Sequence, residues 1–396
     1  MSLKFEIHNR SVEHAGRTGT ITTPHGSFQT PAFMPVGTRG SVKGLTPAQI
    51  SSTGSEIILN NAYHLMLRPG DEQIAELGGV HKFMRWDHPI LTDSGGYQAW
   101  SMADINTVDE DGVTFKSIID GSKIRVTPER SIEIQNNLGA DIIMAFDDCP
   151  SSVEPQTQNL ARRRYALTKR DGVLTATEQE SRLLQSLDRT ARWLERCQKS
   201  HRRPDEQALF GIVQGGTNFD LRERSVQQVC NVELPGYAIG GVAVGESPEK
   251  IKEIVKFTAT LLPQEKPRYL MGVGYERDLV SAVASGMDMF DCVLPTRNGR
   301  NGHAFTRKGQ LHLRNACFKA DEVVIEDGCT CTTCSQGFSR AYLRHLYMSK
   351  EMLGGILVSM HNIHHFQSLM IDIRASIEDN SWSSLPQRWP VLDATK

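Results

Sequence analysis

The sequence predicts an α/β protein whose main body is a closed (β/α)8 TIM barrel. Eight short apolar runs recur along the chain, and most are followed by a polar or Gly-rich turn and a longer stretch with helical periodicity. Continuous apolar strands that alternate with helices indicate a parallel sheet covered on both faces. Eight repeats favour a closed barrel over an open doubly wound sheet.

The eight predicted strands are short and consist mostly of aliphatic and aromatic residues. They lie at Phe33–Val36, Ile57–Leu59, Ile90–Thr92, Asp141–Phe146, Leu209–Val213, Tyr237–Ile239, Tyr269–Met271 and Met287–Phe290. Helices are predicted after two late strands, at Ser247–Leu262 and Arg277–Ser285. The first begins with Ser-Pro-Glu, a helix-start pattern in which Ser247 is the cap.

Two regions interrupt this alternation. Val113–Ile118 and Lys123–Thr127 flank an Asp-Gly pair, which predicts a β-hairpin inside one βα unit. The polar region 150–207 is rich in Gln and Arg and has helical patterning over Ser181–Ser200. A last helix is predicted at about 362–378, with apolar residues on one face.

Composition excludes several classes of protein. The chain has 396 residues, 39% of them hydrophobic and 23% charged, which is ordinary for a globular protein and excludes disorder throughout. No apolar run approaches the roughly 20 residues that span a bilayer, and the N-terminus lacks a signal-peptide core. We therefore expect a cytoplasmic protein without a membrane partner.

Polar residues follow the predicted strands at a position that recurs from one strand to the next. In a barrel these positions meet at one mouth, where active sites lie. Capping of the next helix explains any one of them, but not so many carboxylates and amides together. They are Asn61, Asp93, Asp147, Gln214, Gly240-Gly241, Gly272 and Asp291.

Asp147 and Gln214 together suit a heterocyclic base that carries both donors and acceptors on its edge. Guanine-like rings fit this description, and so do other heterocycles. Tyr97 and Met271 could stack on a flat ring, although either alone is more commonly a packing residue. The glycines after Asp93 let a ligand approach the backbone, but they form no phosphate-binding motif.

Three of the eight cysteines form a cluster. Cys329, Cys331 and Cys334, followed by His361, predict a closed tetrahedral zinc site that is structural because no coordination position stays open. His364 and His365 are alternative fourth ligands. The remaining cysteines are scattered, at Cys149, Cys197, Cys230, Cys292 and Cys317.

Local charge differs from net charge. The chain has 44 basic and 46 acidic residues, a net charge of −2, which alone argues against a nucleic-acid partner. Between Arg297 and Ala320, however, six basic residues are uninterrupted by acidic ones, and a second basic run spans Arg162–Arg170. The first run follows Asp291 closely, which favours a phosphate-binding strip.

With these residues assembled, the chain resembles the tRNA-guanine transglycosylases (the queuine tRNA-ribosyltransferase family) of bacterial type. The resemblance covers most of the chain. Its motifs, in order, are TPHGSFQTPAFMPVGT (23–38), NAYHLMLRPG (61–70), TDSGGYQ (92–98), MAFDDC (144–149), FGIVQGG (210–216), YAIGGVAVGE (237–246), RYLMGVGY (268–275) and MFDCVLPTRNGRNG (289–302).

The resemblance implies that guanine at the tRNA wobble position is replaced by a 7-deazaguanine base in queuosine biosynthesis. It implies Asp291 as the nucleophile on the ribose, Asp93 as the acid/base group and Asn61 as its orienting partner. Arg297 and Arg300 would contact tRNA. The implied base-binding residues are Ser94, Tyr97, Asp147, Cys149, Gln214, Gly240, Gly241, Val242, Val244, Glu246 and Met271.

The resemblance also implies an organisation and a substrate. We expect a barrel with an N-terminal β extension over 1–315, a zinc-binding subdomain over 316–362 and a C-terminal helical segment over 363–396, in a homodimer. Val244 would close the space around the 7-substituent, which favours 7-aminomethyl-7-deazaguanine. Alternatives are a queuine-inserting enzyme and a non-catalytic tRNA-binding accessory subunit; retention of Asp93 and Asp291 argues against the latter.

The chain departs from the family pattern in three places. Asn60 and Ala62 replace the Gly and Thr usual beside Asn61, and residues 165–188 resemble an insertion whose role the sequence does not reveal. The spacing from Cys334 to His361 is one residue longer than usual, close to an expected dimer surface with Phe338, Tyr342 and His345 as candidate contacts.

Overall fold

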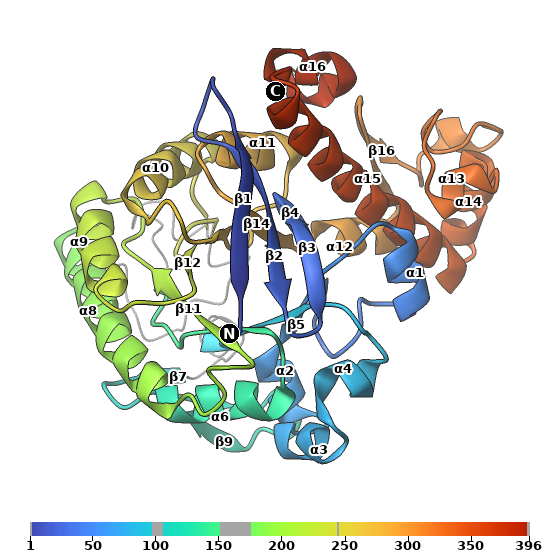
Figure 1. Ribbon diagram of the computed structural model, residues 1–396. Helices are drawn as coiled ribbons and strands as arrows, with labels where there is room; N and C mark the ends of the chain where they lie inside the picture. The colour runs from blue at the N-terminus through green and yellow to red at the C-terminus, as the bar shows by residue number, and fades with distance from the viewer. Residues whose placement is uncertain (1, 97–105, 151–175, 244, 394–396) are drawn as a thin grey trace.

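The computed structural model describes residues 2–96, 106–150, 176–243 and 245–393 (Figure 1). Eight parallel strands close into a barrel, and neighbours around it follow chain order until the last strand pairs with the first. The predicted barrel and all eight predicted strands are confirmed. The strands are β4 (Ala32–Gly37), β5 (Ile58–Asn61), β6 (Ile90–Asp93), β10 (Ile142–Met144), β11 (Ala208–Val213), β12 (Gly236–Ile239), β13 (Arg268–Leu270) and β14 (Met289–Cys292).

Helices surround the barrel in Figure 1 and cover the outer faces of its strands. They are α1 (Pro47–Ser52), α2 (Ala62–Leu67), α3 (Asp71–Glu76), α4 (Gly79–Met84), α6 (Pro128–Leu138), α8 (Ala176–Ser200), α9 (Phe219–Cys230), α10 (Pro248–Leu261), α11 (Glu276–Ala284) and α12 (Leu294–Arg300). Ser247 caps α10 by accepting from the Lys250 N–H, as predicted.

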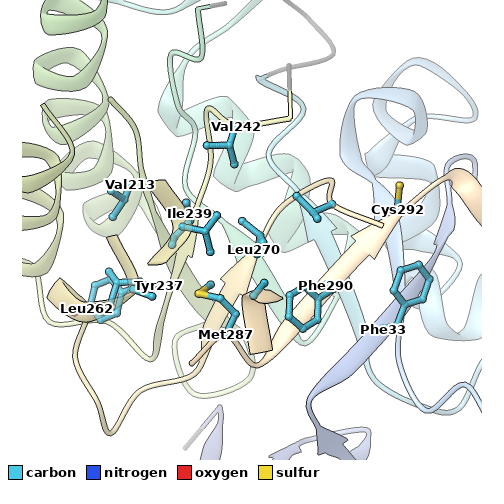
Figure 2. Close-up of a cluster of buried hydrophobic side chains, with 14 of the residues drawn as sticks. Phe33, Val213, Tyr237, Ile239, Val242, Leu262, Leu270, Met287, Phe290 and Cys292 are labelled. Carbon is cyan, nitrogen blue, oxygen red and sulfur yellow. The ribbon is translucent and has the colours of Figure 1, made fainter. Parts of the chain in front are cut away.

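Two layers of apolar side chains hold the barrel. Inward-facing residues such as Met34, Phe210 and Tyr269 fill its interior. Outward-facing residues pack between the strands and the helices; Figure 2 shows part of this shell, including Phe33 and Phe290. Because strand residues alternate between the two layers, a polar side chain reaches the barrel mouth chiefly where a strand ends.

An N-terminal antiparallel sheet closes one end of the barrel. It consists of β1 (Lys4–Arg10), β2 (Arg17–Thr23) and β3 (Gly26–Thr30), drawn in blue in front of the barrel in Figure 1. Ile21 and Phe28 join the interior cluster. The sheet lies at the amino ends of the barrel strands, so the opposite end is the mouth that a substrate can reach.

The predicted hairpin is confirmed and is part of a larger sheet. β7 (Asn106–Val108), β8 (Val113–Lys116) and β9 (Lys123–Val126) form an antiparallel sheet between β6 and α6. Helix α8 contains the predicted Ser181–Ser200 helix and begins earlier, at Ala176. The basic run at 162–170 and the first part of the insertion-like stretch, residues 165–175, lie outside the described residues.

The metal-binding segment follows the barrel and packs on the longest helix, α15 (Met352–Glu378), which begins ten residues before the predicted 362. Its other elements are β15 (His303–Thr306), β16 (Gly309–His312), η1 (Ala316–Phe318), α13 (Thr332–Ser335) and α14 (Arg340–Met348), and η2 (Trp382–Ser384), α16 (Leu385–Arg388) and η3 (Pro390–Leu392) end the chain. Among the described residues, no helix has the length and apolar character needed to cross a membrane.

Candidate active site

The predicted strand-end residues gather at the carboxyl end of the barrel. Asn61 and Asp93 are the last residues of neighbouring strands and pair in register. Asp291 lies in β14, Asp147 comes three residues after the end of β10, and Gln214 follows β11 directly. Asp93, Asp147 and Asp291 therefore share one mouth, as the strand-end positions predict.

Asn61 holds Asp93 in place. The Asn61 Oδ1 accepts from the His64 N–H at 2.9 Å and caps α2, which turns its Nδ2 toward the Asp93 carboxylate. Nδ2 donates to Asp93 Oδ2 at 2.5 Å, and the Ala62 N–H donates to Oδ1 at 3.0 Å. Burial raises the pKa of Asp93 to about 7 against these hydrogen bonds, with a further rise from the charge of Asp291.

Asp291 is held by the strand beside it. The Tyr269 hydroxyl donates to Asp291 Oδ1 at 2.6 Å, and the Gly272 N–H donates to the same oxygen at 2.8 Å. Burial raises the pKa of Asp291, while these two hydrogen bonds lower it. Sequence reasoning missed the role of Tyr269, which lies inside an apolar run and looks like any other strand residue.

Asp147 and Gln214 form the second buried pair. Gln214 Nε2 donates to Asp147 Oδ2 at 2.6 Å, and the Ser94 hydroxyl donates to Oδ1 at 3.3 Å. Burial raises the pKa of Asp147 to about 7, and the adjacent charge of Asp148 adds to the rise. The two groups thus stand together in a buried place where a polar ligand edge would exchange hydrogen bonds with them.

Asp148, which sequence reasoning also missed, anchors the chain directly after Asp147. Arg182 donates to both Asp148 oxygens at 2.8 Å, Arg189 donates to Oδ2, and the Asp148 N–H donates to Thr190 Oγ1. All three partners come from α8. The adjacent Asp147 and Asp148 were the indication in the sequence that both have a role. The partners of Asp148, however, lie more than 30 residues further along the chain.

Glycine is required where β12 ends. Gly240 and Gly241 follow this strand, and Gly241 has a left-handed φ of +62°. A Cβ on Gly241 would lie 2.3 Å from Gln214 Oε1, and one on Gly240 would lie 2.7 Å from Ile212 Cγ2 and 3.0 Å from Gln214 Nε2. The glycines therefore let the Gln214 amide lie directly against the backbone.

The remaining predicted base-binding residues border this mouth or fall outside the described residues. Val242 is buried and packs with the shell, where Figure 2 shows it beyond Ile239. Cys149 is buried, and burial raises the pKa of its thiol. Glu246 is half-buried. Tyr97 and Val244 lie outside the described residues.

The predicted tRNA contacts lie on α12, which begins three residues after Asp291. Arg297 is exposed and Arg300 is half-buried. Burial and the charge of Arg297 lower the pKa of Arg300. Two cations thus stand one helical turn apart on the helix that follows Asp291.

Cys329, Cys331, Cys334 and His361 converge into a group that could hold a metal ion. The three Sγ atoms lie 3.7, 3.4 and 3.5 Å from His361 Nδ1. His361 Nε2 lies 2.7 Å from the Phe305 carbonyl, which fixes Nδ1 as the ligand atom.

The alternative ligands His364 and His365 are engaged elsewhere. His364 lies at 3.1 Å from Thr330 Oγ1 and 3.2 Å from the Thr53 carbonyl. His365 Nε2 pairs with Glu276 at 2.8 Å. Nearness to His361 in the sequence does not bring His364 or His365 to the cysteines, because neighbouring residues on α15 point in different directions.

A sequence model of the family described as queuine tRNA-ribosyltransferase matches residues 12–171 and 167–390. Curated relatives named queuine tRNA-ribosyltransferase, from Streptococcus uberis and Streptococcus suis, are each 47% identical over 379 residues. One of the same name from Streptococcus pyogenes serotype M5 is 49% identical over 379 residues. Each alignment covers 96% of this chain and 93% of the relative.

Proposed function

The chain belongs to the queuine tRNA-ribosyltransferase family, and we propose that its barrel mouth exchanges the wobble guanine of tRNA for 7-aminomethyl-7-deazaguanine. The chain is a tRNA-guanine transglycosylase, a pentosyltransferase of the queuosine pathway. The single observation that carries the residue assignment is the convergence of Asp93, Asp147 and Asp291, each held by its own hydrogen-bond partners.

Asp291 is the nucleophile of the proposed mechanism. Tyr269 and Gly272 bind its Oδ1, and we assign the other oxygen, Oδ2, to attack on the ribose C1′. The bond from C1′ to N9 of guanine breaks as the bond from C1′ to Oδ2 forms. A second displacement by the incoming base restores the original anomeric configuration, as in retaining glycosidases. The covalent ester keeps the sugar on the enzyme between the two steps.

Asp93 transfers the proton that the departing base gains and the incoming base loses. A pKa of about 7 leaves this carboxyl partly protonated near neutral pH, the condition under which a group both gives and takes protons efficiently. Asp93 donates a proton to the departing guanine and later accepts the N9 proton of the incoming base. Protons therefore balance over a full exchange without any other reactant.

Asp147, Gln214 and the Gly241 backbone N–H recognise the base. In its ionised form the Asp147 carboxylate accepts from ring and exocyclic N–H groups of guanine, and Gln214 both donates and accepts. Guanine offers O6 and N7 as acceptors on its other edge, but a 7-deazaguanine lacks N7. O6 is therefore the acceptor common to both bases, and we assign the Gly241 N–H to it. Tyr97 and Met271 stack on the ring.

The proposed incoming base carries a small 7-substituent. Cys149 is buried beside Asp147, and Val244 in the chain after Gly241 would fill space that a bulkier substituent needs. Glu246 would hold the Val242–Ala243 peptide in alternative orientations for different bases. Direct competition between 7-aminomethyl-7-deazaguanine and queuine for labelled guanine tests this choice, and a preference for queuine contradicts it.

We propose zinc as the ion of the cysteine site. A tetrahedral ion bonded at about 2.3 Å to sulfur and about 2.05 Å to nitrogen holds each sulfur about 3.6 Å from the nitrogen. The three distances of 3.4–3.7 Å fit this requirement. The ion would tie His361 on α15 to the loop of the three cysteines and take no part in the reaction.

Two further assignments complete the proposal. All eight cysteines lie in the described residues and none is in a disulfide, which fits a reducing cytoplasm. Tyr342 is 41% exposed on α14 and its ring stacks with those of Phe338 and His345, which supports a homodimer through this surface. Sedimentation of the purified chain checks the dimer.

The deciding experiment measures incorporation of labelled guanine into tRNA by the purified chain and by an Asp291→Asn variant. We expect exchange by the wild type and a loss of at least about 10³-fold in the variant, because the amide cannot form the ester. Denaturing electrophoresis with 9-deazaguanine present should show a covalent enzyme–RNA band for the wild type alone. Retained turnover by the variant contradicts the assignment.

A further inference from the structure

Arg222 on α9 is completely buried, yet its guanidinium contacts backbone carbonyls of the two loops that carry base-recognition groups. Nε donates to the Gly216 carbonyl at 2.8 Å, and Nη2 to the Gly241 carbonyl at 3.1 Å. Nη1 donates to the Val213 carbonyl at 3.1 Å and the Gly240 carbonyl at 2.8 Å. One side chain thus joins the ends of β11 and β12.

We propose that Arg222 is a positioning residue for base recognition, which fixes the peptides of Gly240 and Gly241 so that the next N–H groups face the base. The inference rests on the proposed function, because it concerns the same mouth. It goes beyond that function in assigning the orientation of the recognition backbone to one buried side chain.

Peptide planarity fixes the direction of the N–H group that follows each carbonyl. In a trans peptide the carbonyl and the following N–H point in opposite directions. Because Arg222 holds the Gly240 and Gly241 carbonyls, the N–H groups of Gly241 and Val242 point away from the guanidinium. Helix α9 lies outside the barrel (Figure 1), so these N–H groups point inward, toward the mouth to which the chain after β10 and β11 brings Asp147 and Gln214.

Recognition of the base requires that these N–H groups keep one orientation. Gly241 has a left-handed φ and no side chain, so its backbone has more accessible conformations than that of other residues. An N–H that recognises O6 discriminates between bases only when it cannot turn away and offer a carbonyl instead. Arg222 prevents that rotation, because turning either peptide would leave a buried guanidinium N–H without its acceptor.

The planar shape of the guanidinium allows Arg222 to hold both loops at once. A planar guanidinium presents donors in several fixed directions, and four carbonyls from two loops use them. A lysine ammonium at the same place could not span both loops with the same geometry. Burial lowers the pKa of Arg222 to about 10, which still leaves the group charged at neutral pH.

The competing explanation is that Arg222 only pins α9 to the barrel. Arg224, two residues later, offers a matched control because it also joins α9 to another element. Its side chain is 49% exposed and pairs with Asp188 of α8, far from the recognition backbone. An Arg224→Met variant therefore loses a helix contact of the same kind without touching the loops.

The test compares wild type, Arg222→Lys, Arg222→Met and Arg224→Met in exchange of labelled guanine into tRNA. We expect the KM for the base to rise about tenfold or more in both Arg222 variants, while the KM for tRNA stays within about twofold. Arg224→Met should match the wild type. The ratio of inhibition constants for 2,6-diaminopurine, which lacks O6, and guanine should fall in the Arg222 variants alone.

Unchanged base KM and unchanged ratio in folded Arg222 variants would overturn the inference while leaving the proposed function standing. Lack of exchange by the wild type would instead reject the proposed function. Amide hydrogen exchange on the wild type keeps the inference testable if neither Arg222 variant folds. Guanine should slow exchange at Gly241, and an unchanged rate there contradicts the proposed orientation.

Discussion

At the scale of single residues, the three carboxylates of the mouth differ in what holds them. Asn61 holds Asp93, Gln214 pairs with Asp147, and Tyr269 binds Asp291. Burial raises the pKa of all three, and different partners oppose the rise in each. One mouth can therefore contain an ionised nucleophile and a proton-exchanging acid side by side.

Replacing Tyr269 by Phe tests how the nucleophile stays ionised. The Tyr269 hydroxyl lowers the pKa of Asp291, so its loss should raise that pKa further. Exchange needs the ionised form, so activity is lost as pH falls through this pKa. We expect the acidic limb of the kcat/KM profile to move to higher pH.

Tyr237→Phe is the matched control for this prediction. Tyr237 lies on the neighbouring strand β12, and its hydroxyl donates to the Val232 carbonyl on the outer side of the barrel. Its profile should follow the wild type. Coincident acidic limbs for Tyr269→Phe and wild type would show that the hydroxyl does not control the ionisation of Asp291.

The three carboxylates that meet at the mouth were predictable from the sequence because each follows or ends a short apolar run. Tyr269 and Arg222 were not. Tyr269 acts only because barrel closure sets β13 beside β14, and this pairing is not visible inside an apolar run. Arg222 lies in an amphipathic helix, where an arginine usually faces solvent. Burial decided its role, and burial of a charged side chain is a property of the folded neighbourhood.

At the scale of elements, the turn between β2 and β3 is tied to the barrel by one buried carboxylate. Asp141, just before β10, accepts from His25 Nδ1 at 2.8 Å, from the Ile90 N–H at 2.8 Å and from His81 at 3.0 Å. The His25 and His81 rings stack, with centroids 3.6 Å apart. The sheet that closes the barrel is thus fastened through a pH-dependent contact.

His25→Gln should destabilise the protein in a limited pH window. The hydrogen bond to Asp141 raises the pKa of His25, so this stabilisation is present below the unfolded-state value of about 6.5 and is lost as pH rises through the folded-state value. The pKa of Asp141 is lowered, so its share is lost only in strong acid. His25 is partly exposed, which keeps the effect near or below about 1 kcal/mol.

Chemical denaturation at pH 5.5 and pH 8.5 measures this difference. The destabilisation by His25→Gln should be larger at pH 5.5. His8→Gln serves as the control, because His8 lies on the same sheet and bonds only an exposed Thr20 hydroxyl at 2.7 Å. Equal effects of His25→Gln at both pH values would mean that its charge does not contribute.

Helix α15 begins ten residues before its predicted start, because the adjacent Gly354 and Gly355 weaken the helical pattern of its first turns. These turns pack on the cysteine segment through Leu357 and Val358. The helix runs continuously from that segment to the barrel, across the boundary predicted at 362. A local sequence pattern cannot show that one helix packs on both the cysteine segment and the barrel.

Removal of the metal should therefore unfold the cysteine segment while the barrel stays folded. Structural zinc contributes about 10–16 kcal/mol in small zinc peptides, and residues 316–351 have only a small apolar core of their own. Hydrogen exchange after chelation should show lost protection there and retained protection in β4–β14. Cys331→Ser should behave the same way and Cys317→Ser, an exposed thiol, should not. Retained protection in the metal-free segment would contradict a structural role.

At the scale of the whole molecule, a net charge of −2 coexists with a polyanionic substrate because charge is distributed unevenly. The amino end of the barrel is closed by the β1–β3 sheet, and the cations of α12 stand at the opposite end beside Asp291. An acidic average lowers binding to polyanions in general, while a local basic strip of this kind would direct tRNA to the mouth. Overall charge was therefore a poor predictor of the partner.

The salt dependence of tRNA binding distinguishes an effect of the basic strip on α12 from an effect of the overall net charge. Arg297→Met and Arg300→Met should each remove about one phosphate contact, which lowers the slope of log K for tRNA against log salt by about 0.7–0.9. Arg10→Met, at the closed end, removes the same formal charge from an exposed arginine and should leave the slope unchanged. Because all three variants shift the net charge equally, equal slopes would mean that tRNA responds to overall charge, and a lower slope for the α12 variants alone places the RNA at the mouth that holds Asp291.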